Sequence, residues 1–385
     1  MRALNIYAGA RARAHVQAHG LLPAHVGVIP AAAGGPKGLI LGPLDRFIFG
    51  QWLPQSSQNV ALVGASIGAW RMATACLNQP VAAFERLEHD YIHQHYELPE
   101  GQKRVSAQQV SDEFGQNLQA FYGGRIAEVL SHPRYQLHIM TSHGQRLLRR
   151  EHPWLTPVGY AAAFLSNAVQ RRALGGWLER VVFSAQGASL PFDAGDYQTL
   201  QCALTEGNFM DALQASCSIP FVLKAVHDIA GAPPGAYWDG GITDYHLHLR
   251  YAGLPAAAHP ARAANAAEDP LVKDTSAQSS APGAGIVLYP HFQKAVVPGW
   301  LDKGLKSRHR ATSALDSMVL LAPNPAWLQT LPNAKLPDRS DFARYGNDLA
   351  SRVAAWTGAA SAAQQLAIEF AAWLERPDMG QVLPI

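Results

Sequence analysis

The chain has 385 residues, of which 48% are hydrophobic and 16% charged, so it can bury a large core in one big domain or in a domain with an extension. The formal net charge is +2 and the basic clusters at 146–150 and 306–310 are short, so nothing indicates a nucleic-acid partner. No apolar run reaches the ~20 residues of a membrane-spanning helix, and the first twenty residues lack the apolar region of a secretory signal. We therefore expect a cytoplasmic protein, although export without an N-terminal signal is compatible with this sequence.

The first part of the chain alternates helical and strand-like patterns. In order, we expect a helix at 8–20, a strand at 25–30, a helical run at 39–53, a strand at 60–63 and a further helix directly after it. This order is typical of a mostly parallel sheet covered by helices, so we predict the α/β class.

The rest of the chain continues the alternation. The expected elements are helices at 79–96 and 106–130, a strand at 135–142, a helix at 160–180, strands at 181–185 and 200–204, a helix at 208–218, a strand at 285–292, and helices at 340–356 and 360–376. Residues 255–284 interrupt it, because they are rich in Ala, Ser and Pro without periodicity, which indicates a flexible surface insertion. We expect 285–385 to pack on the same domain as the part before the insertion.

Metal and disulfide signals are weak. Cys76, Cys202 and Cys217 are odd in number and far apart, which argues against a disulfide framework and fits a reducing compartment. There is no C-x-x-C pair for zinc and no carboxylate cluster suited to calcium. We therefore expect no cofactor and no metal.

Residues 64–68 read GASIG and place Ser66 between Gly64 and Gly68, where a strand-like run passes into a helical one. G-x-S-x-G in this context is the pattern of a nucleophile elbow, in which the glycines avoid collisions in a tight turn. The serine would then lie at a helix N-terminus, where negative charge is favoured. The alternative is an ordinary strand-to-helix turn whose glycines serve packing alone.

Two other segments could complete a site around Ser66. In the loop AAAGGPKG, Gly34 and Gly35 can offer backbone N–H groups to an anion and Lys37 adds positive charge, although a simple tight turn explains the same pattern. Asp239 ends a strand-like run and precedes two glycines, so it is a candidate base, although Asp-Gly turns are common. A phosphate-binding P-loop does not fit, because Gly38 follows the lysine.

Together, GGPKG, GASIG and DGG, with ASCSIP (215–220) before the last, resemble the motifs of the patatin-like phospholipases in their order and spacing over residues 24–250. The resemblance implies a three-layer α/β/α fold with a mostly parallel sheet, here with extra C-terminal helices. It implies a lipid acyl hydrolase that uses a Ser66–Asp239 dyad through an acyl-enzyme, without histidine or cofactor. The oxyanion hole that it implies consists of Gly34, Gly35, Lys37, Gly38 and Ile67.

This sequence departs from the family pattern at two places. Ala32 and Ala33 replace the first Asp and Gly of the family's loop, which leaves open which N–H groups form the hole. Ile67 stands in the elbow where the family often has a small residue. The resemblance implies that the 24–250 catalytic domain binds a lipid or fatty acyl ester.

Three alternatives remain open at this stage. A Ser–His–Asp hydrolase would recruit His291 at the end of a downstream strand. A metal site could use alternating histidines on a strand, with the ligands Asp239, Asp244, His246 and His248. A lipid-binding protein that has lost activity is the third alternative, which the altered loop keeps open.

An enzyme acting on lipids needs an apolar entrance to its active site. The segments 159–165 and 296–301 could supply one, but we expect both to belong mainly to the core. We accordingly expect at most transient contact with a membrane surface.

Overall fold

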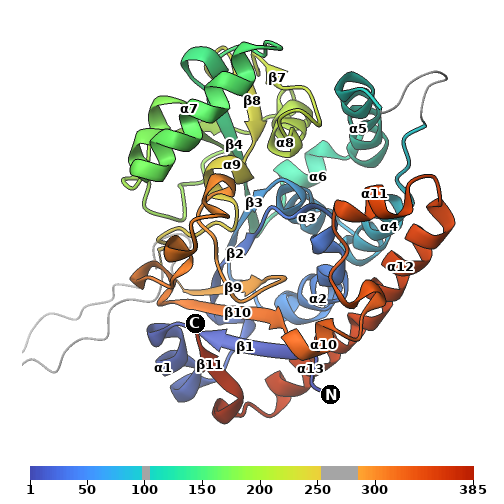
Figure 1. The fold of residues 1–385 in the computed structure, drawn as a ribbon. Coiled ribbons are helices and arrows are strands. Elements are labelled where there is room, and N and C mark those ends of the chain that lie inside the picture. The colour runs from blue at the N-terminus through green and yellow to red at the C-terminus, as the bar shows by residue number, and fades with distance from the viewer. Residues whose placement is uncertain (98–104, 253–284) are drawn as a thin grey trace, which may run out of the picture.

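The computed structural model describes residues 1–97, 105–252 and 285–385, so the insertion predicted at 255–284 lies outside the described residues. Within these described residues, eleven strands form one sheet in the middle of the molecule, with helices around it (Figure 1). The strands are β1 (Leu4–Ala8), β2 (Val26–Ala31), β3 (Val60–Ala65), β4 (Tyr135–Gly144), β5 (Leu178–Ser184), β6 (Thr199–Ala203), β7 (Val226–His227), β8 (Ala236–Asp239), β9 (Ile286–Pro290), β10 (Met318–Pro323) and β11 (Val382–Pro384).

The sheet order is β11-β1-β10-β9-β2-β3-β4-β5-β6, and β8 pairs with β4 and β7. The run β10-β9-β2-β3-β4 is parallel throughout. Strands β2 and β3 are buried over their whole length, as expected for parallel strands covered on both faces. The predicted fold class, α/β with a mostly parallel central sheet flanked by helices, is confirmed.

Helices cover this sheet along its length. They are α1 (Ala10–His19), α2 (Gly42–Phe47), α3 (Ile67–Ala75), α4 (Pro80–His93), α5 (Ala107–Tyr122), α6 (Ile126–Leu130), α7 (Leu155–Val169), α8 (Phe209–Cys217), α9 (Gly241–Asp244), α10 (Pro325–Leu328), α11 (Ser340–Tyr345), α12 (Leu349–Ala362) and α13 (Gln364–Glu375). Helix α3 packs on β2, β3 and β4, and α1 packs on β1 and β10. Among the described residues, no helix combines the length and the hydropathy needed to cross a membrane.

Several element predictions were wrong at their edges. The helix predicted at 160–180 ends at Val169, and β5 begins at Leu178 after a short 3₁₀ segment that contains Gly175 and Gly176. The helix predicted at 106–130 is divided at Gly123–Gly124, and the one at 340–356 is divided at Gly346, which has a φ of +52°. Strands β1 and β10 were not predicted.

Two strands meet end to end on one edge of β4. Strand β3 runs parallel to β4 until Ala65 lies opposite Met140, and β8 runs antiparallel to β4 with Asp239 opposite Thr141. Strand β5 occupies the other edge of β4 over the same stretch, so β3 and β8 share an edge and point toward each other. This topology brings the residue that follows β3 next to the last residue of β8.

Candidate active site

Ser66 lies at the sharp turn between β3 and α3. Its backbone has φ +57° and ψ −130°, a conformation that costs a non-glycine residue energy and is concentrated at functional sites. A Cβ on Gly64 would lie 2.4 Å from the Cα of Ala69, and one on Gly68 would lie 1.9 Å from the carbonyl oxygen of Ala31. Both glycines are therefore required by close packing of the turn, and the turn presents Ser66 at the start of the helix.

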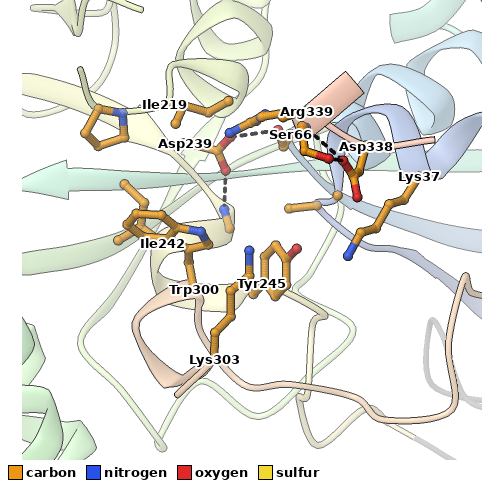
Figure 2. Close-up of a pocket in the computed structure, with 15 residues that line it drawn as sticks. Lys37, Ser66, Ile219, Asp239, Ile242, Tyr245, Trp300, Lys303, Asp338 and Arg339 are labelled. Carbon is orange, nitrogen blue, oxygen red and sulfur yellow. Dashed lines mark hydrogen bonds between the residues drawn. The ribbon is translucent and has the colours of Figure 1, made fainter. Parts of the chain in front are cut away.

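Ser66 and Asp239 are joined by a direct hydrogen bond. The Ser66 hydroxyl donates to Oδ2 of Asp239 over 2.7 Å, and the N–H of Gly241 donates to Oδ1 over 2.7 Å (Figure 2). A Cβ on Gly240 would lie 2.1 Å from the Met140 carbonyl oxygen, so this position also needs glycine. The two carboxylate oxygens thus have different partners, since Oδ2 accepts a hydrogen bond from the Ser66 hydroxyl and Oδ1 accepts one from a backbone N–H.

Asp239 is buried, with 6% of its surface exposed. Burial raises its pKa to about 6, although the hydrogen bonds from Ser66 and Gly241 and the charges of Arg339 and Lys303 act in the opposite direction. A carboxylate with a raised pKa is a stronger base and is still mostly ionised near neutral pH. The site therefore holds a proton acceptor in contact with a serine hydroxyl.

The segment 215–220 joins the two halves of this pair. The hydroxyl of Ser216 accepts a hydrogen bond from the Ser66 N–H over 3.0 Å and donates one to the Met140 carbonyl over 2.7 Å. The N–H of Asp239 donates to the Ser218 carbonyl over 2.9 Å. The sequence motif was recognised, but the contact from Ser216 to the elbow was not predicted, because nothing local in the sequence distinguishes this serine from Ser218.

The glycine-rich loop lies beside Ser66. Gly34, Gly35 and Ile67 each line a cavity that Ser66 also lines, and their N–H groups donate to no backbone carbonyl or side chain among the described residues. Gly35 has a φ of +56°, which suits glycine. Gly38 is placed differently, because it packs against the Ile67 side chain and lines neither cavity that contains Ser66. Free backbone N–H donors near the serine are therefore available from three of the five residues of the expected hole, and the fourth, Lys37, lines the same cavity as Ser66.

The structure also places the residues of the alternative sites. His291 is fully buried; its Nδ1 contacts the backbone of Gln293, and its Nε2 has no hydrogen-bond partner among the described residues. It therefore makes no hydrogen bond to the Ser66–Asp239 pair.

The proposed metal ligands are held apart by other contacts. His246 and His248 follow α9 in a turn and an irregular segment instead of a strand, and the Nδ1 atom of each faces a backbone carbonyl. Asp244 is bound by Arg180 at 2.7 Å. The expectation that these histidines alternate on a strand was wrong, and the described part of the chain contains no group of three or more metal-ligating side chains arranged around one point.

Two cavities meet at Ser66. One cavity, of about 260 Å³, is lined by the charged side chains of Lys37, Asp239, Lys303 and Arg339 as well as by apolar ones such as Ile242 and Trp300, and we call it the polar cavity for its charged groups. The apolar cavity has a volume of about 520 Å³. Its lining includes the large apolar side chains of Trp70, Phe114, Val222, Leu223 and Phe342. Ser66, Ile219 and Arg339 line both, so the serine lies where a polar and an apolar space adjoin.

The two segments expected to be core are partly exposed. In 159–165, Tyr160 and Ala163 are buried, whereas Phe164 and Leu165 are 43% and 65% exposed. In 296–301, the valines are buried and Trp300 is 39% exposed and lines the polar cavity. The prediction of core segments therefore holds for the inward side chains of each segment and fails for the outward ones.

Neither a scan against protein-family models nor a search of curated proteins found a match to this chain. The geometry of the site therefore carries the functional argument.

Proposed function

We propose that this protein is a lipid acyl hydrolase of the patatin-like type, which hydrolyses carboxylic esters through a Ser66–Asp239 dyad. The observation that carries the proposal is the 2.7 Å hydrogen bond between the Ser66 hydroxyl and Asp239, formed at a strained turn between β3 and α3. A nucleophile in contact with a base that is itself oriented by a third group is the arrangement that covalent catalysis needs. Here the third group is the N–H of Gly241.

The reaction proceeds in two steps. Ser66 Oγ attacks the ester carbonyl carbon while its proton passes to Asp239, and the negative oxygen that forms is held by N–H groups of Gly34, Gly35 and Ile67. The carbon–oxygen bond to the alcohol then breaks, and Asp239 returns its proton to that alcohol. Water attacks the acyl-enzyme, Asp239 accepts a proton from the water, and Ser66 leaves and recovers its proton from Asp239. No other reactant is required.

The apolar cavity supports a fatty acyl chain as the part of the substrate that is transferred. Its volume of about 520 Å³ is within the ~300–1,000 Å³ usual for small-molecule sites, and its wall contains Trp70, Phe114 and Leu223. The cavity reaches Ser66, so a chain lying in it would present its ester carbonyl to the nucleophile.

Exposed apolar side chains near the cavities support transient contact with a lipid surface. Phe221 and Val222 are 62% and 45% exposed and follow Ile219, which lines both cavities. Tyr160 of α7 packs against Phe221, and the side of α7 that faces solvent carries Val158, Leu165 and Val169, each more than half exposed. Such a surface would suit short contacts with aggregated lipid.

The test is hydrolysis of a p-nitrophenyl ester of a medium-chain fatty acid. We expect Ser66→Ala to lower kcat by about 10⁴-fold or more and Asp239→Asn to lower it by about 10²–10⁴-fold. We expect His291→Gln, checked for an unchanged melting temperature, to keep kcat within about threefold of the wild type, because His291 makes no hydrogen bond to Ser66 or Asp239. Loss of activity in a folded His291→Gln would favour a Ser–His–Asp triad, and an inactive wild type on esters and phospholipid vesicles would favour lipid binding without catalysis.

A further inference from the structure

The apolar cavity also contains charged side chains. Its lining includes two arginines, Arg339 and Arg352, and contains no aspartate or glutamate from the described residues. Arg339 also lines the polar cavity together with Ser66 and Asp239, whereas Arg352 lines the apolar cavity but not the polar one. Arg352 therefore belongs to a part of the apolar cavity that is separate from the polar space beside the reacting groups.

Arg352 is a buried cation without a counter-ion. It is 4% exposed, and it makes no ion pair within 4.0 Å of a carboxylate in the described part of the chain. The carboxylate of Asp341 is engaged by Lys335 at 2.8 Å and by the indole N–H of Trp356 at 3.0 Å. A buried charge without a partner is unfavourable, and an anionic ligand would compensate it.

The guanidinium of Arg352 also has more donors than acceptors around it. A guanidinium carries five N–H donors. Among the described residues, Nη2 donates to the Gln94 carbonyl and Nε has no hydrogen-bond partner. Tyr91 and Tyr96 line the same cavity and add only neutral polar groups to its wall. The described residues thus offer this cation no acceptor that carries negative charge.

Aromatic rings hold the Arg352 side chain in place. Its guanidinium carbon lies 4.5 Å from the centre of the Phe342 ring and 4.9 Å from that of the Trp356 ring. Helix α12, which carries Arg352 and Trp356, packs against α11 and α4 (Figure 1). Because cation–π contacts orient a guanidinium without cancelling its charge, the side chain is preorganised to bind an anion.

The chemistry of the residue favours a carboxylate as that anion. Burial lowers the pKa of Arg352, but a guanidinium stays protonated at neutral pH, so loss of a proton does not remove the charge. The planar guanidinium matches the two oxygens of a carboxylate, which can accept two parallel N–H bonds. The rest of the lining includes Trp70, Phe114 and Leu223, whose side chains suit a chain of methylene groups.

We propose that the apolar cavity binds an acyl chain whose far end carries a carboxylate, and that Arg352 binds this carboxylate while the ester carbonyl lies at Ser66. The inference rests on the proposed function and narrows its substrate class to esters of dicarboxylic acids in which one carboxylate is free. The nucleophile, the apolar walls and the unpaired cation all line one cavity. Because a neutral acyl chain leaves Arg352 buried and unpaired, the enzyme should discriminate against it.

The first test compares two p-nitrophenyl esters that differ only at the far end of the acyl chain. One is mono-p-nitrophenyl nonanedioate, and in the other a primary amide replaces the free carboxylate, which removes the charge and keeps the shape. The comparison is repeated with the hexanedioate and dodecanedioate esters, to match the chain to the cavity. We expect kcat/KM for the carboxylate ester to exceed that for the amide ester at least tenfold at one or more lengths. Equal values at all three lengths would overturn the proposal.

Variants of Arg352 identify the residue responsible. Arg352→Met should lower kcat/KM for the carboxylate ester about tenfold or more, through a higher KM, and that for the amide ester less than threefold. Arg352→Lys keeps the charge without the planar fork and should lie between the wild type and Arg352→Met. Arg344 is exposed on α11 and does not line the cavity, so Arg344→Met is the matched control and should change neither ester. An equal loss on both esters in a folded Arg352→Met would show a packing role and would overturn the proposal.

The second test measures binding without hydrolysis, using the Ser66→Ala protein and isothermal titration calorimetry. The ligands are the monomethyl esters of the same dicarboxylic acids and the corresponding methyl esters with a terminal amide. The carboxylate ligand should bind at least tenfold more tightly, and adding Arg352→Met should remove most of that difference. Carboxylate binding that Arg352→Met leaves unchanged would place the anion elsewhere and would overturn the proposal.

The two tests separate the carboxylate site from the proposed function. A wild type that hydrolyses the carboxylate and amide esters equally well would contradict the carboxylate site while the hydrolase stands. A wild type that hydrolyses none of the esters would contradict the proposed function, and the binding measurements with Ser66→Ala would still decide whether Arg352 binds a carboxylate.

Discussion

Asp239 is a carboxylate held where its charge is unfavourable. It is 6% exposed and burial raises its pKa to about 6, yet its two oxygens accept hydrogen bonds from Ser66 and Gly241. Because those bonds favour the ionised form and burial disfavours it, the side chain is ready to change its protonation state near the pH at which it would work.

The pH dependence of hydrolysis follows from this residue. Since the ionised form of Asp239 is the base, kcat/KM should rise about tenfold per pH unit at low pH and level off above about pH 6. The measurement is kcat/KM for a neutral p-nitrophenyl ester between pH 4.5 and 8. A profile that stays flat through pH 6 would contradict the assignment of Asp239 as the base.

The same residue makes a prediction about stability. A carboxyl group whose pKa is higher in the folded state than in the unfolded chain contributes stability at low pH, which is lost as the pH rises from about 4 through about 6. Asp239→Asn removes this penalty and keeps an oxygen that can accept the hydrogen bond from the Gly241 N–H. At pH 8 the free energy of unfolding of this variant, measured by urea denaturation, should therefore exceed that of the wild type by up to about 3 kcal/mol. The difference should shrink at pH 4.5. An Asn variant that is less stable than the wild type at pH 8 would show that the ionised carboxylate is a net stabilising group.

Single residues differed in how far the sequence could predict them. Ser66 and Asp239 were predicted because each lies beside glycines that a tight turn requires, and such turns leave a local pattern. Lys303 and Arg339 were missed because they reach the cavity from segments far along the chain, and nothing near them in the sequence distinguishes them from other surface cations. Gly38 matched the pattern of the glycine-rich loop, but in the structure it packs against the Ile67 side chain.

The elements around the site depend on a few buried polar contacts. The hydroxyl of Ser216 on α8 links the Ser66 N–H to the Met140 carbonyl of β4, so one side chain connects the elbow, a helix and a strand. Ser218, two residues later, donates to the Gln214 carbonyl of its own helix instead.

Replacing Ser216 should therefore affect catalysis as well as stability. Ser216→Ala leaves a buried donor and a buried acceptor unpaired, which should cost about 1–3 kcal/mol of unfolding free energy. Because the elbow loses an anchor, kcat should also fall about tenfold or more while KM changes little. Ser218→Ala is the matched control. Equal kcat in the two variants would mean that Ser216 has only a structural role.

Strands and helices could be predicted from the sequence where one local pattern of apolar residues determines the type of element. Strands β2 and β3 are continuous buried apolar runs, and both were predicted. The start of β5 was assigned to a helix because Glu179 and Arg180 interrupt its apolar pattern. Arg180 is nevertheless fully buried, since Asp196 and Asp244 neutralise it, and that pairing involves residues distant in the sequence.

At the scale of the molecule, both ends of the chain complete the sheet. Strand β1 lies between β10 and β11, and the carboxylate of Glu369 on α13 accepts hydrogen bonds from the N–H groups of Ala3 and Leu4 at 2.8–3.0 Å. Strand β10 is a continuous buried apolar run that was overlooked, whereas its pairing with β1 joins segments more than 300 residues apart, and no local pattern reveals that pairing. The fold class was predictable from the middle of the chain, but the addition of the N-terminal and C-terminal strands to one edge of the sheet was not.

Removing this closing contact should destabilise the molecule without changing its chemistry. Glu369→Ala should lower the unfolding free energy by about 2–3 kcal/mol, because hydrogen bonds to a charged group are lost, and unfolding should remain a single transition. The exposed Glu375→Ala, at the end of the same helix, should change it by less than about 0.5 kcal/mol. Urea denaturation followed by circular dichroism measures both. A separate early transition in Glu369→Ala would show that the terminal strands unfold independently of the rest.

The central claim is that Ser66 is a nucleophile activated by Asp239, and covalent labelling tests it most directly. A long-chain alkyl fluorophosphonate forms a bond from phosphorus to an activated serine oxygen and releases fluoride, and intact mass spectrometry counts the adducts. We predict one adduct on the wild type, located on Ser66 by peptide mapping, slower labelling of Asp239→Asn by about 10²-fold or more, and none on Ser66→Ala. Labelling of the Ser66→Ala protein at the wild-type rate, or an adduct on another serine, would contradict the claim.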